Sequence, residues 1–106
     1  WRFDSSRLPK TAVELGSGAG LAGLCAAAHG VDVTLSDGDG RVLPLLRANV
    51  QDFCSKCSVE GTNALAAVMK LDLESSEEVS SVLEERGGEV DAVLASDVVY
   101  EPKMMA

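Results

Sequence analysis

The segment TAVELGSGAGLAG, residues 11–23, constrains the fold of this chain more than any other feature. A short apolar stretch, interrupted by Glu14, runs directly into glycines at alternate positions, Gly16, Gly18 and Gly20. The stretch 12–15 predicts a strand buried on both faces, as in parallel sheets. The alanine- and leucine-rich segment 21–29 predicts a helix. A strand, a turn without side chains and a helix N-terminus together favour a site where a ligand lies against backbone.

The rest of the chain repeats this alternation of strand and helix. Strands are predicted over residues 31–35, 65–71 and 90–96, and helices over residues 39–53 and 75–86. The segments 36–40 and 54–63 are predicted to be connecting loops. This order predicts an α/β fold with a parallel sheet whose strands lie in the order 3-2-1-4. We expect one partial domain over residues 1–106, with a lead-in, 1–10, a cofactor-binding half, 11–106, and both chain ends inside a larger protein.

Each predicted strand ends next to an acidic residue. These residues are Glu14, Asp37, Asp72 and Asp97. Ligands of open α/β sheets bind at the carboxyl ends of the strands, so we expect the four carboxylates to surround one binding site. Solubility explains a single acid at a strand end, but it is a weaker explanation for four.

Charge and composition exclude several classes of partner. The chain carries 17 acidic and 9 basic side chains, a net charge of −8, and has no cluster of Lys and Arg that would neutralise phosphates. Binding to nucleic acid through this segment is therefore not expected. No apolar run approaches the about 20 residues of a membrane-spanning helix, so no membrane association is expected either.

The three cysteines follow no disulfide pattern, which predicts a reducing compartment. We expect a cytoplasmic location, with the nucleus as the alternative. Cys54 and Cys57 have the spacing of a metal or redox pair, but no second pair accompanies them. We therefore predict ordinary thiols and no metal site.

The glycines fit two different cofactor motifs. Gly18, Gly20 and Gly23 match the dinucleotide fingerprint, with Asp37 near the position of its ribose-binding acid. That match begins two residues after the strand ends. The alternative pattern, Glu14-x-Gly16-x-Gly18-x-Gly20, begins where the strand ends.

The carboxylates favour the second motif. A dinucleotide presents an anionic pyrophosphate, whereas S-adenosylmethionine has a sulfonium cation and no phosphate. Asp37 is placed to accept hydrogen bonds from both ribose hydroxyls, and Asp72 from the adenine amino group. The glycine backbone would hold the methionine part, with the helix N-terminus favouring its carboxylate.

Several segments together resemble the family-16 seven-strand methyltransferases, which are mainly protein-lysine methyltransferases. They are ELGSGAGLAGL at 14–24, SD at 36–37, RVL at 41–43, LRANV at 46–50 and ASDVVY at 95–100. Within that family these motifs are most similar to those of the elongation factor 2 lysine methyltransferase group. The calmodulin and chaperone lysine methyltransferases are the next most similar groups. The resemblance implies a Rossmann-like, S-adenosylmethionine-dependent methyltransferase fold.

The resemblance also implies roles for particular residues. Asp97 and Tyr100 would face the methyl-transfer site. The cofactor would be bound by Trp1, Glu14, Gly16, Ser17, Gly18, Gly20, Asp37, Asp72 and Ser96. The chain departs from the family at Leu73, where the family usually has a tryptophan that stacks on the adenine.

These observations predict an S-adenosylmethionine-dependent N-methyltransferase that modifies a lysine of a protein, such as a translation factor or a chaperone. One alternative is an NAD(P)-dependent oxidoreductase, for which Tyr100 and Lys103 have the spacing of a proton-donor pair in the wrong strand context. Another is a non-catalytic module that binds S-adenosylmethionine. Methylation of nucleic-acid bases is less favoured, because the segment DVVY, 97–100, lacks the proline pair that such sites use after the acid.

Overall fold

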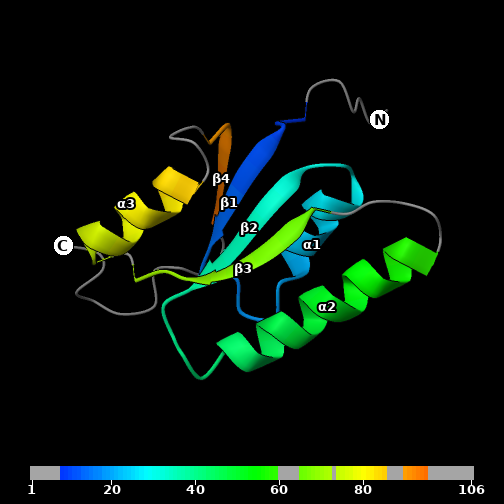
Figure 1. Cartoon of the computed structure of the whole chain (residues 1–106), viewed down its shortest axis with the longest axis horizontal. Helices are drawn as coiled ribbons and strands as arrows, with labels where there is room; N and C mark the ends of the chain where they lie inside the picture. The colour runs from blue at the N-terminus through cyan, green and yellow to red at the C-terminus, as the bar shows by residue number, and fades with distance from the viewer. Residues whose placement is uncertain (1–7, 60–64, 73, 86–89, 96–106) are drawn as a thin grey trace.

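The computed structural model describes residues 8–59, 65–72, 74–85 and 90–95, and strands and helices alternate along them (Figure 1). The elements are β1 (Thr11–Leu15), α1 (Leu21–Ala28), β2 (Asp32–Asp37), α2 (Leu43–Val59), β3 (Ala66–Lys70), α3 (Ser76–Glu85) and β4 (Ala92–Ala95). The alternation predicted from the sequence is confirmed.

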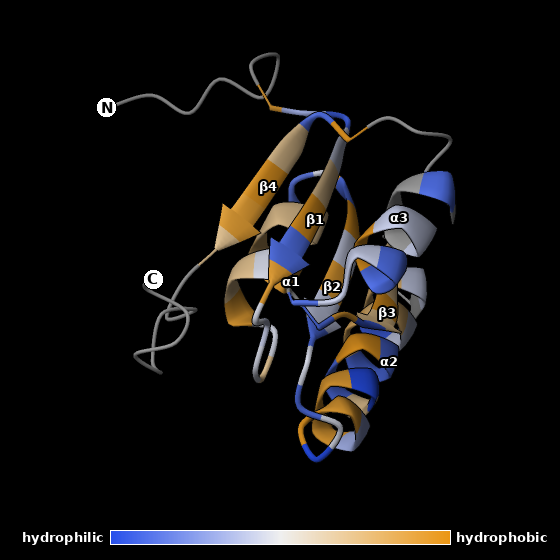
Figure 2. Ribbon diagram, turned by 90° about the vertical axis from the view of Figure 1, so that its left-hand side faces the viewer, coloured by the Kyte–Doolittle hydropathy of each residue, from blue (hydrophilic) through white to orange (hydrophobic). Residues whose placement is uncertain are grey.

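The four strands form one parallel sheet in the order β3-β2-β1-β4, which confirms the predicted order. Glu14 of β1 pairs with Leu35 of β2 and with Leu94 of β4, and Leu35 pairs with Val68 of β3. The two central strands, β1 and β2, are therefore the ones that end in the glycine turn and in Asp37. β4 is an apolar strand that has β1 as its neighbour (Figure 2). Its Val93 is 62% exposed.

The two faces of the sheet carry separate apolar layers. Helices α1 and α2 cover one face over a core made of Ala12, Ala27, Val31, Val33, Leu35, Leu43, Leu46 and Val50. On the other face Val13 and Leu71 pack with Leu15, Met69, Val79 and Val90. Successive residues of β1 point to opposite faces, so Ala12 lies in the first layer and Val13 in the second. Burial on both faces explains why β1 lacks the polar alternation of an exposed strand.

The prediction that residues 36–40 form a loop is wrong for the first two of them. Ser36 and Asp37 belong to β2 and pair with Met69 and Lys70 of β3. The Leu71 N–H extends the same ladder by donating to the Asp37 carbonyl at 3.1 Å. These residues favour turns locally, but the ladder of a central buried strand outweighs that preference. The loop therefore begins at Gly38.

Helix α2 begins later and ends later than predicted. A turn precedes it, because the Asp39 carbonyl accepts from Val42 N–H at 3.0 Å and the Asp39 carboxylate from Arg41 N–H at 2.9 Å. Pro44 lies in the first turn, where its missing N–H costs little. The predicted connector from Cys54 onward is helical to Val59. It contains no Gly or Pro to end the helix, and Asp52 and Lys56 form an i,i+4 ion pair at 2.9 Å.

Half of a capping box forms at the start of α3. The Ser75 hydroxyl accepts from Glu78 N–H at 3.2 Å, as the pattern predicts. The Glu78 carboxylate, instead of returning to Ser75, accepts from the Asp72 N–H. Helix α3 is thereby tied to the end of β3. Among the helices of the described ranges, none combines the length and apolarity needed to cross a membrane.

Helix α1 lies close to the sheet at Gly23. A Cβ atom at Gly23 would lie 2.7 Å from the Glu14 Oε1 and 2.7 Å from the Leu35 Cδ2. We predict that Gly23→Ala destabilises the full-length protein by about 1–3 kcal/mol through overpacking, which exceeds the roughly 1 kcal/mol gained from helix propensity. Urea unfolding monitored by circular dichroism measures the change.

Gly40→Ala is the matched control for this substitution. A Cβ atom at Gly40 would meet nothing within 4 Å, and its backbone lies outside the left-handed region. The control is expected to unfold at the wild-type denaturant concentration. Equal midpoints for the two variants would contradict the close approach of α1 to the sheet.

Candidate functional site

The glycine turn, defined here as residues 16–20, begins directly after β1 ends at Leu15. Gly16, Gly18 and Gly20 have φ angles of 60°, 56° and 91°. These angles lie in the left-handed region, which residues with a Cβ atom adopt at a cost. The alternate glycines therefore follow from the backbone path, and the motif that starts at Glu14 coincides with the end of the strand.

Two serines join the glycine turn to β2. The Ser17 N–H donates to the Ser36 carbonyl at 2.8 Å, and the Ser36 N–H donates to the Ser17 Oγ at 3.0 Å. The Ser36 hydroxyl donates to the Glu14 carbonyl at 2.6 Å. Ser17 was predicted to bind the cofactor, and the structure shows its hydroxyl bonded to β2. Ser36 belongs to the segment SD, 36–37, which resembles the family, but no role was predicted for it.

Asp37 lies at the end of β2 beside the same turn. Its Oδ2 accepts from the Gly18 N–H at 3.0 Å and its Oδ1 from the Asp39 N–H at 2.9 Å. The carboxylate is 7% exposed and keeps further lone pairs for a ligand. The sequence prediction that Asp37 and the glycines form one site is consistent with this direct contact.

Asp72 follows β3 at the neighbouring strand end. Gly38 lies against it, because a Cβ atom at Gly38 would be 3.5 Å from the Asp72 Cα and 3.1 Å from the Leu71 carbonyl oxygen. The Asp72 Oδ1 accepts from the Glu74 N–H at 2.9 Å, and the side chain is exposed. Asp37 and Asp72 thus lie at adjacent strand ends on one edge of the sheet.

Glu14 lies beneath the turn and not at the open edge. Glu14 is 2% exposed and faces α1, where its Oε1 would lie 2.7 Å from a Cβ atom at Gly23. Its Oε1 has no hydrogen-bond donor among the residues that the structure describes. Helix α1 has no side-chain N-cap and no acid in its first turn, and the Glu14 carboxyl lies beside this turn at Gly23.

Burial shifts the protonation of Glu14. Removal of the carboxylate from water raises the pKa of Glu14 above its ordinary value of 4.5, and hydrogen bonding from the Ser17 side chain and the Gly23 amide offsets part of this shift. The neutral carboxyl is therefore favoured more in the folded protein than in the unfolded chain.

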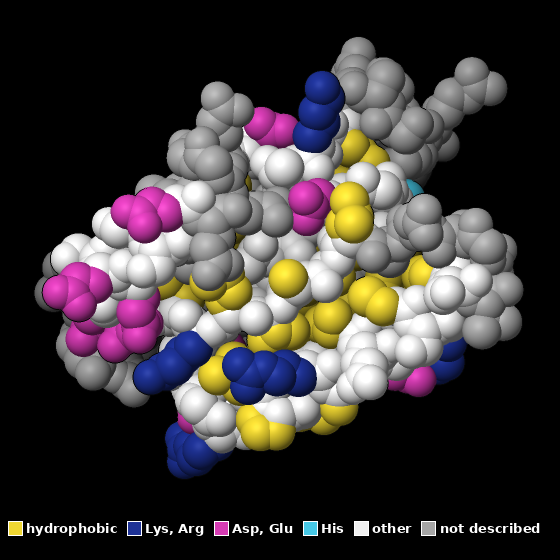
Figure 3. All heavy atoms as spheres, viewed as in Figure 1, with side chains coloured by type: hydrophobic (Ala, Val, Ile, Leu, Met, Phe, Trp, Pro, Cys, Tyr) yellow, Lys and Arg dark blue, Asp and Glu magenta, His cyan; other side chains and the backbone are white. Residues whose placement is uncertain are grey.

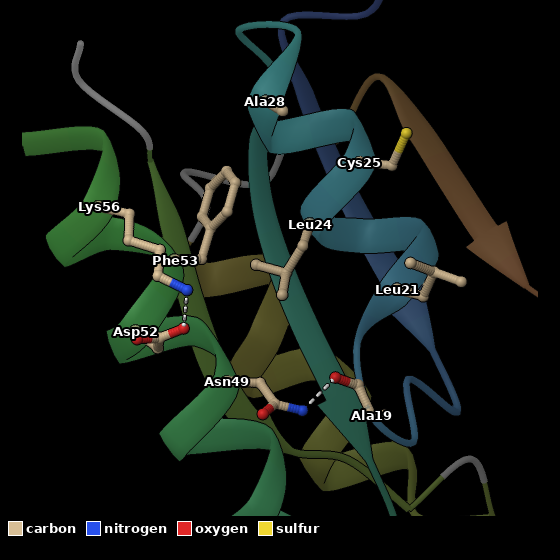
Figure 4. Close-up of a pocket in the computed structure, with 9 residues that line it drawn as sticks. All are labelled: Ala19, Leu21, Leu24, Cys25, Ala28, Asn49, Asp52, Phe53 and Lys56. Carbon is tan, nitrogen blue, oxygen red and sulfur yellow. Dashed lines mark hydrogen bonds and ion pairs between the residues drawn. The ribbon is translucent and has the colours of Figure 1, made fainter. Parts of the chain in front are cut away.

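Asn49 of α2 binds the glycine turn from the side of the helix (Figure 4), whereas Ser36 and Asp37 bind it from β2. Its Nδ2 donates to the Ala19 carbonyl at 2.8 Å. Asn49 also lies at one end of a groove between α1 and α2, with Leu21, Leu24 and Phe53 along its walls. Sequence reasoning quoted the segment around Asn49 without giving this residue a role. The signal available in the sequence was its position three residues after Leu46, which places both residues on the same side of the predicted helix.

Carboxylates gather over α3 in Figure 3, with Lys and Arg side chains below them in the same view. Lys70, the register partner of Asp37 on β3, is exposed. Arg41 is the basic residue nearest to Asp37 in the sequence, and it is bound by Asp39 with Nε–Oδ1 and Nη2–Oδ2 distances of 3.0 and 2.9 Å. The Arg41 side chain holds the pKa of Asp39 below its usual range. Across the described ranges, no group of three side chains is placed to hold a metal ion.

Four predicted site residues lie outside the described residues. They are Trp1, Ser96, Asp97 and Tyr100. Their assignments stay predictions from the sequence.

The family was tested by comparison with known proteins. A family model described as lysine methyltransferase matches residues 3–106. The chain belongs to the lysine methyltransferase family. This membership, together with the fold, gives S-adenosylmethionine as its cofactor. Curated proteins provide no significant match.

Solved structures share the fold. A SAM-dependent methyltransferase from Agrobacterium tumefaciens is 24% identical, with a TM-score of 0.54 over 82% of this chain and 25% of that chain. A short chain dehydrogenase from Mycobacterium smegmatis is 18% identical, with a TM-score of 0.57 over 96% of this chain and 44% of that chain. The chain therefore spans less than half the length of either, and the likeness establishes an α/β Rossmann-like architecture.

Glu14→Gln tests the buried carboxyl. Because folding favours the neutral form, Glu14 contributes most to stability below pH 4.5, and this contribution is lost as the pH rises through the raised pKa. We predict that the unfolding free energy of Glu14→Gln minus that of the wild type increases from pH 4.5 to pH 8. Urea unfolding of both proteins across this range measures it. A difference that is constant or decreases with pH would contradict the raised pKa.

Proposed function

We propose that the protein is an S-adenosylmethionine-dependent methyltransferase that methylates a lysine side chain of another protein. The main support is the glycine turn bonded directly to Asp37 at the end of β2, in a chain that matches the lysine methyltransferase family over residues 3–106. The turn leaves room for a ligand against backbone, and the acid beside it offers oxygens to hydroxyl groups.

The described residues fit the proposed cofactor. A Cβ atom at Gly18 would meet nothing within 4 Å, so the turn is open there, whereas a Cβ atom at Gly20 would lie 2.9 Å from the Leu46 Cδ1 in the core. Asp37 retains lone pairs suited to the two ribose hydroxyls, and Asp72 at the adjacent strand end suits an adenine amino group. The first turn of α1 carries no acidic residue of its own, which suits a ligand carboxylate at the helix N-terminus.

The charge of the site and the use of its amides argue against a dinucleotide. A pyrophosphate binds to the free N–H groups of a glycine-rich turn. Here the N–H groups of Ser17, Gly18 and Gly20 donate to the Ser36 carbonyl, the Asp37 carboxylate and the Ser17 carbonyl. Fewer amides remain for phosphate oxygens, and nearby carboxylates would repel them. Likeness to a dehydrogenase in fold alone does not outweigh these contacts.

The reaction requires the protein to orient an amine. When bound, S-adenosylmethionine supplies a methyl group on a sulfonium. A lysine has a pKa of about 10.4, so its deprotonation at neutral pH costs roughly 4–5 kcal/mol. The neutral amine would take the methyl group of the bound cofactor as the carbon–sulfur bond breaks, and the sulfur would leave as a neutral thioether.

We assign Asp97 to positioning and not to strong general-base catalysis. A carboxylate close to the amine would raise the pKa of the lysine and increase the cost of deprotonation. Asp97 is therefore expected to hold the amine or the ammonium of the cofactor, and Tyr100 to form a wall of the lysine channel. Both roles rest on the family resemblance of the segment that contains them.

We further propose a translation factor or a chaperone as the class of substrate, because the motifs are most similar to the elongation factor 2 lysine methyltransferase group. A net charge of −8 agrees with a protein partner and argues against nucleic acid. A cytoplasmic or nuclear location would follow from such substrates. A non-catalytic module that binds the same cofactor is the second candidate, and the experiments below separate the two.

Cofactor choice is testable by isothermal titration calorimetry of the full-length protein. We predict binding of S-adenosylhomocysteine and no measurable binding of NAD. Asp37→Asn should weaken binding by about 10- to 100-fold, because hydrogen bonds to a charged group are lost. Asp52→Asn, which removes an exposed carboxylate on α2, serves as the control and should bind like the wild type. Preferential binding of NAD would contradict the proposal.

Methyl transfer is testable by mass spectrometry. The full-length protein, added to a cell lysate with S-adenosylmethionine, is predicted to produce methyl-lysine on a particular protein. Binding of S-adenosylhomocysteine without any methylated product would favour the non-catalytic module. For Asp97→Asn we expect lower turnover or weaker cofactor binding, and a variant unchanged in both would show that the assignment of Asp97 is wrong.

A further inference from the structure

We propose that Ser36 is a positioning residue for the cofactor site: its hydroxyl fixes the end of β1 at the Glu14 carbonyl and so holds the glycine turn that follows in the conformation that binds. This inference rests on the proposed function. Ser36 does not touch the ligand in this proposal. Its hydroxyl acts through the backbone at the end of β1, and its effect should appear in cofactor affinity.

Each polar atom of Ser36 makes one bond to the β1 end or to the turn. Its carbonyl accepts from the Ser17 N–H at 2.8 Å, its N–H donates to the Ser17 Oγ at 3.0 Å, and its hydroxyl donates to the Glu14 carbonyl at 2.6 Å. The first two bonds form a reciprocal pair between Ser17 and Ser36. The third fixes the strand just before the chain leaves the sheet at Gly16.

The turn depends on such bonds because it has few side chains. Glycine loses more conformational entropy on ordering than any other residue, and three glycines here adopt left-handed angles. Ser36 is 1% exposed, whereas Asn49, which binds the turn from α2, is only half-buried. A buried hydrogen bond is not easily replaced by water, so its loss leaves an unsatisfied group.

Loss of the Ser36 hydroxyl should therefore lower the fraction of molecules with a competent turn. Apparent affinity falls by the same factor as that fraction. For Ser36→Ala we expect the Kd for S-adenosylhomocysteine and the KM for S-adenosylmethionine to rise about 5- to 30-fold. The kcat at saturating methyl donor and the KM for the protein substrate should remain unchanged, because the substrate side is not altered.

Two further variants separate positioning from general stability. Ser36→Thr keeps a hydroxyl on a β-branched residue that suits a strand, and it should restore binding. Thr34→Val removes a hydroxyl from another residue that is 1% exposed on the same face of β2, farther from the turn. It should leave cofactor affinity unchanged even where it lowers Tm. Each protein is measured at the same number of degrees below its own Tm.

Hydrogen–deuterium exchange of the ligand-free, full-length protein gives a readout that does not require the cofactor. Amides of residues 16–20 should exchange faster in Ser36→Ala than in Thr34→Val. Unchanged exchange, unchanged Kd, or equal effects of Ala and Thr at position 36 would each overturn the proposal. Wild-type protein that fails to bind S-adenosylhomocysteine would overturn the proposed function and the cofactor role of Ser36 together. Faster exchange would then show only that Ser36 orders the turn.

Discussion

The hydrogen bonds between the glycine turn and the end of β2 are the interaction on which the site depends. Residues 16–20 are mostly glycine and alanine, so side-chain packing fixes their position only weakly. Ser36 and Asp37 hold them from β2, and Asn49 holds them from α2. β2 is suited to this role because it lies between β1 and β3 and is buried over most of its length. These bonds to a rigid central strand restrain a turn whose own side chains would restrain it only weakly.

The same turn explains why an acid is buried in β1. Glycine at the N-cap of α1 provides no side-chain oxygen, and the first turn of the helix has no acid. Glu14 brings a carboxyl to this helix end from below, and Gly23 makes room for it. Burial disfavours the charged form, which raises the pKa, so the carboxyl loses part of its favourable interaction with the helix dipole.

Sequence reasoning predicted the elements and their order because hydrophobic patterns and turn residues agree along most of the chain. It placed Glu14, Asp37 and Asp72 at strand ends, and the structure brings Asp37 and Asp72 to one edge. It missed the burial of Glu14 against α1, since the direction of a side chain depends on the register of the strand. It assigned Ser36 to a loop, because local turn preference conceals a pairing with β3 that is distant in sequence. Trp1, Asp97 and Tyr100 lie beyond the described residues, so their roles rest on the sequence.

Fold alone does not choose between the two cofactor classes, since a methyltransferase and a dehydrogenase match this architecture with TM-scores of 0.54 and 0.57. The choice depends on what the turn amides already bind. A dinucleotide needs turn amides free for its pyrophosphate, but the Gly18 N–H already donates to the Asp37 carboxylate. A ligand without a phosphate does not need this amide, and its ribose can still bind Asp37. One hydrogen bond therefore both orders the turn and disfavours the competing cofactor, which links the stability of the site to its selectivity.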